Sequence, residues 1–212
     1  MKRFQHKKEV QNKVLAAALT LFLKQGYSQT TVKQIIRDAG VTNGTLFHFF
    51  PSKEDILMHL VRDVILGYAH LADGMIKKDD PFLRFALEIG LQLHAVIRQE
   101  AIGELYLEAY NSGRISKMIV EEASRRNREL FQSVRSEFDD DDFYRRTLAV
   151  KGILHAFIHD IVHDQNMESL SRIDGIMEII LSLFNLSAEE IRQTIRKMKR
   201  IIKKQSENVI GL

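Results

Sequence analysis

The 212-residue sequence contains no cysteine, only two prolines and only 11 glycines. The absence of cysteine excludes a disulfide scaffold, thiol catalysis, cysteine-ligated zinc and iron–sulfur clusters. Strand-rich domains need many turns, so the shortage of proline and glycine favours helices. No stretch reaches the roughly 18 apolar residues of a membrane-spanning helix, and the charged start MKRFQHKKEVQ lacks the apolar core of a secretion signal. We therefore expect a cytoplasmic, helical protein.

The net charge of +3 is distributed unevenly along the chain. Residues 1–60 carry nine Lys or Arg against four Asp or Glu, whereas residues 61–186 carry 15 against 21. Residues 187–212 are basic again, with seven against three. A basic amino-terminal third on an acidic body suggests that one end meets a polyanion such as nucleic acid. Chance variation among solvated faces is the alternative that charge alone leaves open.

Apolar residues recur with helical spacing almost throughout the chain. The four aspartates Asp139 to Asp142 are expected to cap the helix that follows them. One domain boundary is expected near residue 60, inside the fourth helix. The pattern predicts an all-α fold with helices at roughly 7–24, 31–39, 42–49, 53–72, 81–100, 101–111, 114–138, 143–164, 169–185 and 187–206.

The segment TVKQIIRDAGVTNGTLFHF, residues 31–49, has the pattern of a helix-turn-helix. Gly40 supplies the positive φ of a sharp turn, and Leu46 can pack the second helix against Ile35. Asn43, Gly44, Thr45 and His48 are then left facing outward, where such side chains can bind base edges or phosphate oxygens. An ordinary turn between two helices is the alternative interpretation of this segment.

The run GYSQTTVKQIIRDAGVTNGTLFHFFPSKEDIL, from Gly26 to Leu57, closely resembles the amino-terminal domain of the TetR family of bacterial transcriptional regulators. The resemblance extends back into the first helix and covers about residues 7–60. It implies a three-helix DNA-binding domain over residues 1–60 and a helical ligand-binding and dimerisation domain over residues 61–212.

The resemblance also implies roles for individual residues. Thr31 is expected to touch phosphate at the start of the second helix, and Lys53 of the Pro-Ser-Lys motif to bind backbone phosphate at the start of the fourth. The family often has tyrosine where this chain has Phe47, so a phenolic phosphate contact is expected to be lost there. The expected DNA-binding residues are Thr31, Thr42, Asn43, Gly44, Thr45, Phe47, His48 and Lys53.

For the second domain, the resemblance implies a small-molecule pocket. His94 lies on the apolar stripe of helix 81–100, where it is either a satisfied core histidine or a ligand contact, with Gly90 leaving space one turn away. A ligand wedged between Tyr68 and that helix would tilt helix 53–72 and change the separation of two recognition helices. The candidate pocket residues are Tyr68, His94, Tyr106, Glu108 and Tyr110; a solvated face is the alternative for Glu108.

Three histidines, His155, His159 and His163, follow one another at helical spacing. A metal site, a dimer seam and plain exposure are the alternatives, and we expect no metal because no further ligand is suitably placed. A two-fold homodimer is expected from helices 143–164 and 169–185, with apolar contact from Ile179, Ile180 and Leu183. A change of Ile180 to arginine is expected to produce monomers.

The basic last helix, IRQTIRKMKRIIKK, is either a membrane-surface helix or docks on the acidic body. Sequence motifs of phosphate loops, dinucleotide sites, serine hydrolases and zinc proteases are absent. We therefore expect no enzyme and no cofactor. The leading hypothesis is a dimeric regulator, a repressor of a palindromic double-stranded DNA operator that a small-molecule effector releases. A helical adaptor or membrane-surface protein is the rival.

Overall fold

The computed structural model describes residues 2–76, 80–163 and 170–210, and every regular element within these ranges is a helix, as the sequence predicts. In chain order the helices are α1 (Lys2–Gln25), α2 (Val32–Ala39), α3 (Asn43–Phe49), α4 (Lys53–Met75), α5 (Pro81–Arg98), α6 (Glu100–Asn111), α7 (Gly113–Phe131), α8 (Asp140–His163), α9 (Leu170–Ser182) and α10 (Ala188–Ile210).

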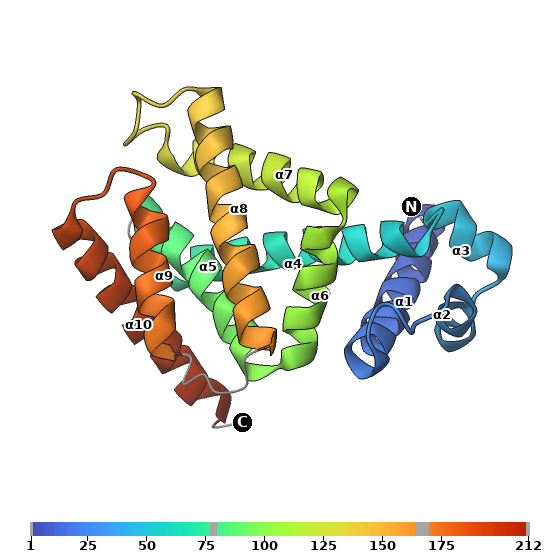
Figure 1. Ribbon diagram of the computed structural model, residues 1–212. Coiled ribbons are helices and arrows are strands. Elements are labelled where there is room, and N and C mark those ends of the chain that lie inside the picture. The colour runs from blue at the N-terminus through green and yellow to red at the C-terminus, as the bar shows by residue number, and fades with distance from the viewer. Residues whose placement is uncertain (1, 77–79, 164–169, 211–212) are drawn as a thin grey trace.

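The helices form a small amino-terminal group and a larger carboxy-terminal group that α4 connects. Figure 1 shows α1, α2 and α3 at one end of the molecule and α5 and α7–α10 at the other. Helix α4 runs from the first group into the second, and α6 lies beside it, facing α1. The predicted boundary at residue 60 therefore falls within a continuous helix.

The central helix of the larger group is α5, which packs against α4, α6, α7, α9 and α10. Its buried residues meet a cluster of phenylalanine rings: Phe85 lies 5.4 Å from Phe131 and 5.0 Å from Phe184, measured between ring centroids. Gly103 brings α6 close to its neighbours, because a Cβ atom there would lie 2.6 Å from the Cγ2 atom of Val162. Aromatic burial of this kind stabilises the group as one packed core.

The prediction for residues 114–138 is wrong at its carboxy-terminal end, since α7 ends at Phe131. The chain turns there, with the Val134 amide donating to the Phe131 carbonyl at 2.9 Å. The Arg135 side chain then donates to the Phe184 carbonyl at 2.7 Å, beyond the end of α9. A contact distant in sequence thus outweighs the local helical pattern.

The aspartate run caps α8, as predicted. The Asp142 amide donates to the Asp139 carboxylate at 2.7 Å, and the Asp139 amide donates to the Asp142 carboxylate at 3.2 Å. These reciprocal bonds satisfy amide donors that the first turn of a helix leaves without partners.

Helix α10 packs on the rest of the domain through Ile191, Ile195 and Met198, all of which are buried. This packing supports the docked interpretation of the basic helix. It also corrects the expectation for Gly90, because the Met198 sulfur lies 2.7 Å from where a Gly90 Cβ atom would be. The space beside Gly90 is therefore filled by α10. No helix in the described part of the chain is long and apolar enough to cross a membrane.

Candidate functional site

The helix-turn-helix has well-defined caps at each helix start. The Thr31 side chain caps α2 in a reciprocal arrangement with Gln34, and Gly40 ends that helix in the left-handed conformation with φ 64°. The Thr42 hydroxyl accepts from the Thr45 amide at 3.1 Å and so caps α3. Ile35 and Leu46 are fully buried between the two helices, as the sequence pattern predicts.

The opposite side of α3 presents small and polar side chains to solvent. Thr42, Asn43, Gly44 and His48 are exposed, and Thr45 is half-buried by its contact with Thr42. Phe47 stands among them with 43% of its surface exposed. Thr31, at the start of α2, is also exposed. Polar donors and acceptors beside an apolar ring make a surface suited to the edges and methyl groups of bases.

Lys53 has contacts that its motif does not predict. Its ammonium group donates to the carbonyls of Tyr27 at 2.8 Å and Thr30 at 2.9 Å, and lies 4.1 Å from the centre of the Tyr27 ring. Burial lowers the pKa of the Lys53 ammonium. These bonds tie the start of α4 to the turn between α1 and α2. A lysine has three N–H donors, so one remains for a phosphate oxygen.

Polar contacts also join the start of α4 to the larger group of helices. Arg114, in the first turn of α7, bridges to the Asp55 carboxylate at 2.7 Å. Ser112 donates to Glu54 at 2.6 Å. The start of α4 is therefore held from both sides, by Lys53 toward the helix-turn-helix and by Arg114 toward the larger group.

A cavity of about 260 Å³ lies between α1, α4, α5, α6, α7 and α8. Small-molecule sites in proteins commonly measure about 300–1,000 Å³, so this volume suits a small ligand or the tail of a larger one. Most of the wall is apolar; its polar members are Tyr68, Glu88, Gln92, Tyr106, Tyr110, Arg126, Asn127, Thr147 and Lys151.

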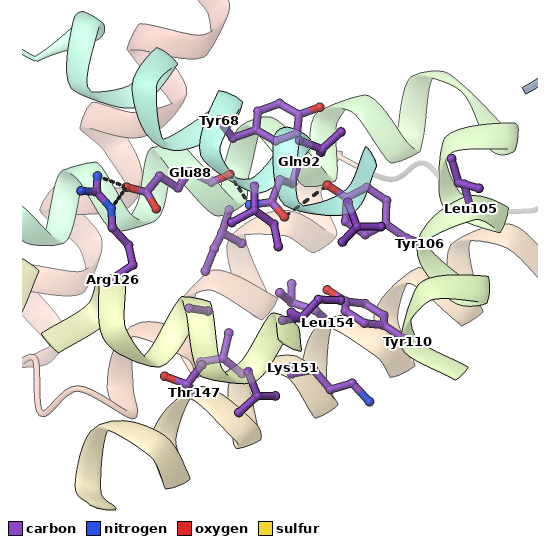
Figure 2. Close-up of a pocket in the computed structure, with 18 of the residues that line it drawn as sticks. Tyr68, Glu88, Gln92, Leu105, Tyr106, Tyr110, Arg126, Thr147, Lys151 and Leu154 are labelled. Atoms are coloured by element: carbon purple, nitrogen blue, oxygen red, sulfur yellow. Dashed lines mark hydrogen bonds and ion pairs between the residues drawn. The ribbon is translucent and has the colours of Figure 1, made fainter. Parts of the chain in front are cut away.

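The polar groups on one side of the cavity are bonded to one another. Arg126 donates to Glu88 at 2.7 Å and to Asp73 at 3.2 Å, and the Tyr106 hydroxyl donates to Gln92 at 3.2 Å. Figure 2 shows the Arg126–Glu88 pair at one side of the pocket, and Tyr110 and Lys151 at another. Burial raises the pKa of Glu88, against the opposing effect of Arg126. The charge of this carboxylate is thus largely matched within the protein.

The tyrosines of the wall remain protonated. Burial raises the pKa values of Tyr68, Tyr106 and Tyr110 above the ordinary value for tyrosine. Each hydroxyl can therefore donate a hydrogen bond at neutral pH.

Comparison with known proteins is consistent with this arrangement. Residues 14–60 match the family model described as bacterial regulatory proteins, tetR family. The chain is 38% identical over 60 residues to the HTH-type transcriptional regulator HbdR of Aromatoleum sp., covering 28% of this chain and 26% of that protein. The HTH-type transcriptional repressor KstR2 of Mycobacterium tuberculosis is 24% identical over 152 residues, covering 69% of this chain and 74% of that protein.

Solved structures extend the similarity over most of the chain. RolR in complex with resorcinol superposes with a TM-score of 0.69 at 19% identity, covering 90% of this chain and 94% of RolR. Thermus thermophilus FadR in complex with lauroyl-CoA gives a TM-score of 0.64 at 14% identity, covering 81% and 93%. Residues 14–60 are thus similar to the TetR family model, and most of the chain shares the fold of these solved structures. Its match to the first curated relatives nevertheless spans only about a quarter of their length. These relatives are transcriptional regulators, not enzymes.

Within this TetR-family fold, three of the five candidate pocket residues line the cavity: Tyr68, Tyr106 and Tyr110. His94 and Glu108 do not line it. Glu108 instead accepts from Ser28 at 3.1 Å, across the junction between α6 and the helix-turn-helix. The Nε2 atom of His94 is buried without a hydrogen-bond partner in the described part of the chain. Burial, followed by the charge of Arg98, lowers the pKa of His94.

Sequence reasoning missed several polar wall residues: Glu88, Gln92, Arg126 and Lys151. Gln92 lies two residues before His94 and so points about 200° away around the helix, since each residue turns by about 100°. The stripe that carries His94 and Gly90 faces α10, and the other face of α5 meets the cavity. Periodicity alone cannot tell which apolar face of such a helix meets a cavity.

The histidine row follows the outer side of α8. His159 is exposed, and its ring lies 4.4 Å from that of His163. The ring of His155 packs 5.6 Å from that of Tyr110. Among the described residues, no group of three potential ligands is arranged to hold a metal ion.

The expectation for Ile180 is wrong. This residue is fully buried in the core, whereas its neighbour Ile179 has 52% of its surface exposed. Arginine at position 180 would therefore place a charge in the protein interior and destabilise the fold. Ile179 is the position on α9 that can meet a partner without disturbing the core.

Proposed function

We propose that this chain is a member of the TetR family and a dimeric transcriptional repressor, which binds a palindromic operator and is released by a small-molecule ligand. The observation that carries the proposal is the position of α4. Its first residue, Lys53, lies at the helix-turn-helix, and its middle residues, including Leu60, Val64 and Tyr68, form one wall of the cavity. The same helix thus belongs to both the proposed DNA-binding domain and the wall of the proposed ligand cavity.

The same helix supplies the mechanism of release. Its 23 residues span about 35 Å at 1.5 Å per residue. A ligand that displaces Tyr68 tilts α4, and the helix-turn-helix at the amino-terminal end of α4 moves with it. Two recognition helices must be spaced near about 34 Å to enter successive major grooves, so a small change in tilt costs affinity. DNA and ligand then weaken each other by the same factor.

A homodimer would form through α8 and α9. Tyr144, Leu148 and Ile179 are large apolar residues with 42%, 47% and 52% of their surfaces exposed. Large exposed apolar side chains on two helices that pack together, α8 and α9, can contribute to a protein interface. Gly152, on the same outer side of α8, has nothing within 4 Å of its Cβ position, which would let a partner helix approach closely. A dimer has two recognition helices, which together make enough base contacts to distinguish one site in a genome.

DNA reading is assigned to residues 1–60, and ligand binding and dimerisation to residues 61–212. Asn43, Thr45 and His48 would read base edges, and Thr31 and Lys53 would position the domain on phosphate. RolR and Thermus thermophilus FadR, which share the fold, are seen with resorcinol and lauroyl-CoA. A small-molecule effector in the cavity between α4 and α8 is the corresponding proposal for this chain.

A gel-shift titration tests the regulator. The probe is the genomic fragment upstream of the gene that encodes the chain and its neighbour, with a scrambled fragment of equal length as control. We expect one saturable complex on the genomic fragment, lost in an Asn43→Ala, Thr45→Ala double variant that melts at the wild-type temperature. Equal affinity for both fragments in wild-type protein would contradict sequence-specific regulation.

A further inference from the structure

The cavity wall contains two tyrosine hydroxyls whose hydrogen-bonding capacity the protein does not use. In the described part of the chain, no hydrogen bond reaches the hydroxyls of Tyr68 and Tyr110, although both residues line the cavity. The Tyr106 hydroxyl, by contrast, is occupied by Gln92. Hydroxyls that face a cavity without a protein partner can donate to an acceptor on a ligand.

A cation lies over the ring of one of these tyrosines. Lys151, on α8, lines the cavity, and its ammonium group lies 5.3 Å from the centre of the Tyr110 ring. Within the described ranges, no carboxylate forms an ion pair with Lys151. His155, one turn later, adds little positive charge at neutral pH, because burial and then Lys151 lower its pKa.

The opposite side of the cavity offers no equivalent attraction for a cation. Glu88 is the only carboxylate in the described wall, and Arg126 already binds it. The remaining wall is predominantly apolar, from Leu19 and Leu23 of α1 to Leu154 of α8. The cavity therefore combines a long apolar surface with one uncompensated positive charge and two free hydroxyl donors.

We propose that the effector is an anionic amphiphile, with an apolar body against α1, α4 and α5 and a single anionic acceptor group bound by Lys151 and the Tyr110 hydroxyl. This inference rests on the proposed function only in taking the cavity as the effector site. Neutral ligands would leave the lysine without a counter-charge, and cationic ones would be repelled by it. A carboxylate and a phosphate share the required chemistry.

Calorimetric titration of the full chain, without DNA, tests the proposal with ligands that share one tail. Decanoate should bind at least about tenfold more tightly than decanol, because a charge-assisted hydrogen bond is stronger than a neutral one. Decyltrimethylammonium should bind more weakly than decanol. Decanoate that fails to bind, or binds no better than decanol, overturns the proposal.

Variants locate the anion. Lys151→Met should weaken decanoate about tenfold and leave decanol unchanged, whereas Lys151→Arg should retain most of the affinity. Tyr110→Phe should weaken decanoate with little effect on decanol. Lys117→Met is the matched control, because Lys117 is an exposed lysine of α7 outside the cavity wall. Unchanged decanoate affinity in Lys151→Met, with wild-type melting temperature, overturns the assignment.

Two further arms separate the possible outcomes. Decanoyl-CoA places its anionic charge on phosphates, so the ligand that Lys151→Met weakens more identifies whether carboxylate or phosphate occupies the site. Parallel gel shifts then separate this inference from the proposed function. Operator release by decanol alone would retain the regulator and overturn the anionic effector. Decanoate binding that depends on Lys151, in a protein that forms no specific DNA complex, would retain the anionic ligand and overturn the regulator.

Discussion

Arg114 offers the sharpest perturbation of the junction between the two groups of helices. Its guanidinium lies 2.7 Å from the Asp55 carboxylate and 3.9 Å from that of Glu54. The Asp55 side chain is only 9% exposed, and Ser52 also donates to it at 2.6 Å. Arg114→Ala would leave this carboxylate with the serine alone and would disconnect the start of α7 from the start of α4.

The expected cost is modest. A hydrogen bond to a charged group contributes about 1.5–3 kcal/mol. Arg114 is 56% exposed, so water screens the pair and the contribution falls to about 1 kcal/mol. In a chain of this length that corresponds to a decrease in melting temperature of about 2–4 °C. Arg125→Ala is the matched control, because Arg125 forms an exposed pair with Glu122 on the same helix and should change stability much less.

The pH dependence provides an independent check. Burial alone would raise the pKa of Asp55, but the Ser52 hydrogen bond and Arg114 together hold it below its ordinary value of 3.8. A depressed carboxyl pKa stabilises the fold fully above the unfolded-state value, and this contribution disappears as the pH falls through the folded-state value. The difference between wild type and Arg114→Ala should therefore be constant above about pH 5 and shrink below pH 4.

Thermal denaturation of both proteins between pH 3.5 and pH 7 measures the stability difference. Gel shifts without effector and with saturating effector measure operator binding and release. Operator affinity should change little, because Arg114 is not among the residues assigned to DNA contact, whereas effector-induced release should be blunted. A stability difference that stays the same at pH 3.5 and pH 7 would refute the role of the Asp55 charge. Undiminished release would show that the tie between α7 and α4 carries no coupling.

Five other substitutions have defined outcomes. Gly103→Ala should destabilise the fold by about 1–3 kcal/mol through overpacking. Gly67→Ala, in the open middle of α4, should instead stabilise the fold by up to about 1 kcal/mol. Urea denaturation measures both changes, and equal effects on the free energy of unfolding would contradict the packing described for Gly103. Asn43→Ala should lose about 1–3 kcal/mol of binding free energy on the operator and should relax the base preference in a binding-site selection. An unchanged base preference would show that Asn43 does not contact the bases. Lys53→Ala should weaken binding to all DNA sequences, and should lower by about one the slope of the logarithm of the binding constant against the logarithm of the salt concentration. A loss of affinity confined to one DNA sequence argues against a phosphate contact. Ile179→Arg should give folded monomers in light scattering. A wild-type protein that is itself monomeric would contradict the proposed dimer.

Local features of this protein are determined by the sequence. The cap at Asp139 and the left-handed turn at Gly40 form as the sequence predicts, and Thr31 and Thr42 cap their helices through equally local bonds. Each depends on groups within about four residues, so the chain needs no distant partner to specify it. The family resemblance covers this same local pattern, which is why the helix-turn-helix and its outward-facing residues could be predicted together.

Features that depend on neighbouring helices were decided only by the tertiary structure. The periodicity of α9 places Ile179 and Ile180 side by side, and only packing buries one and exposes the other. The cavity takes its wall from six helices, so Lys151 and Arg126 join Tyr68 there although no spacing in the sequence relates them. His94 was misplaced for the same reason, because both faces of α5 are apolar and α10 covers the one that carries it. A helix specifies its own periodicity through its sequence, but which face meets a cavity, a core or a partner is set by the helices that pack against it.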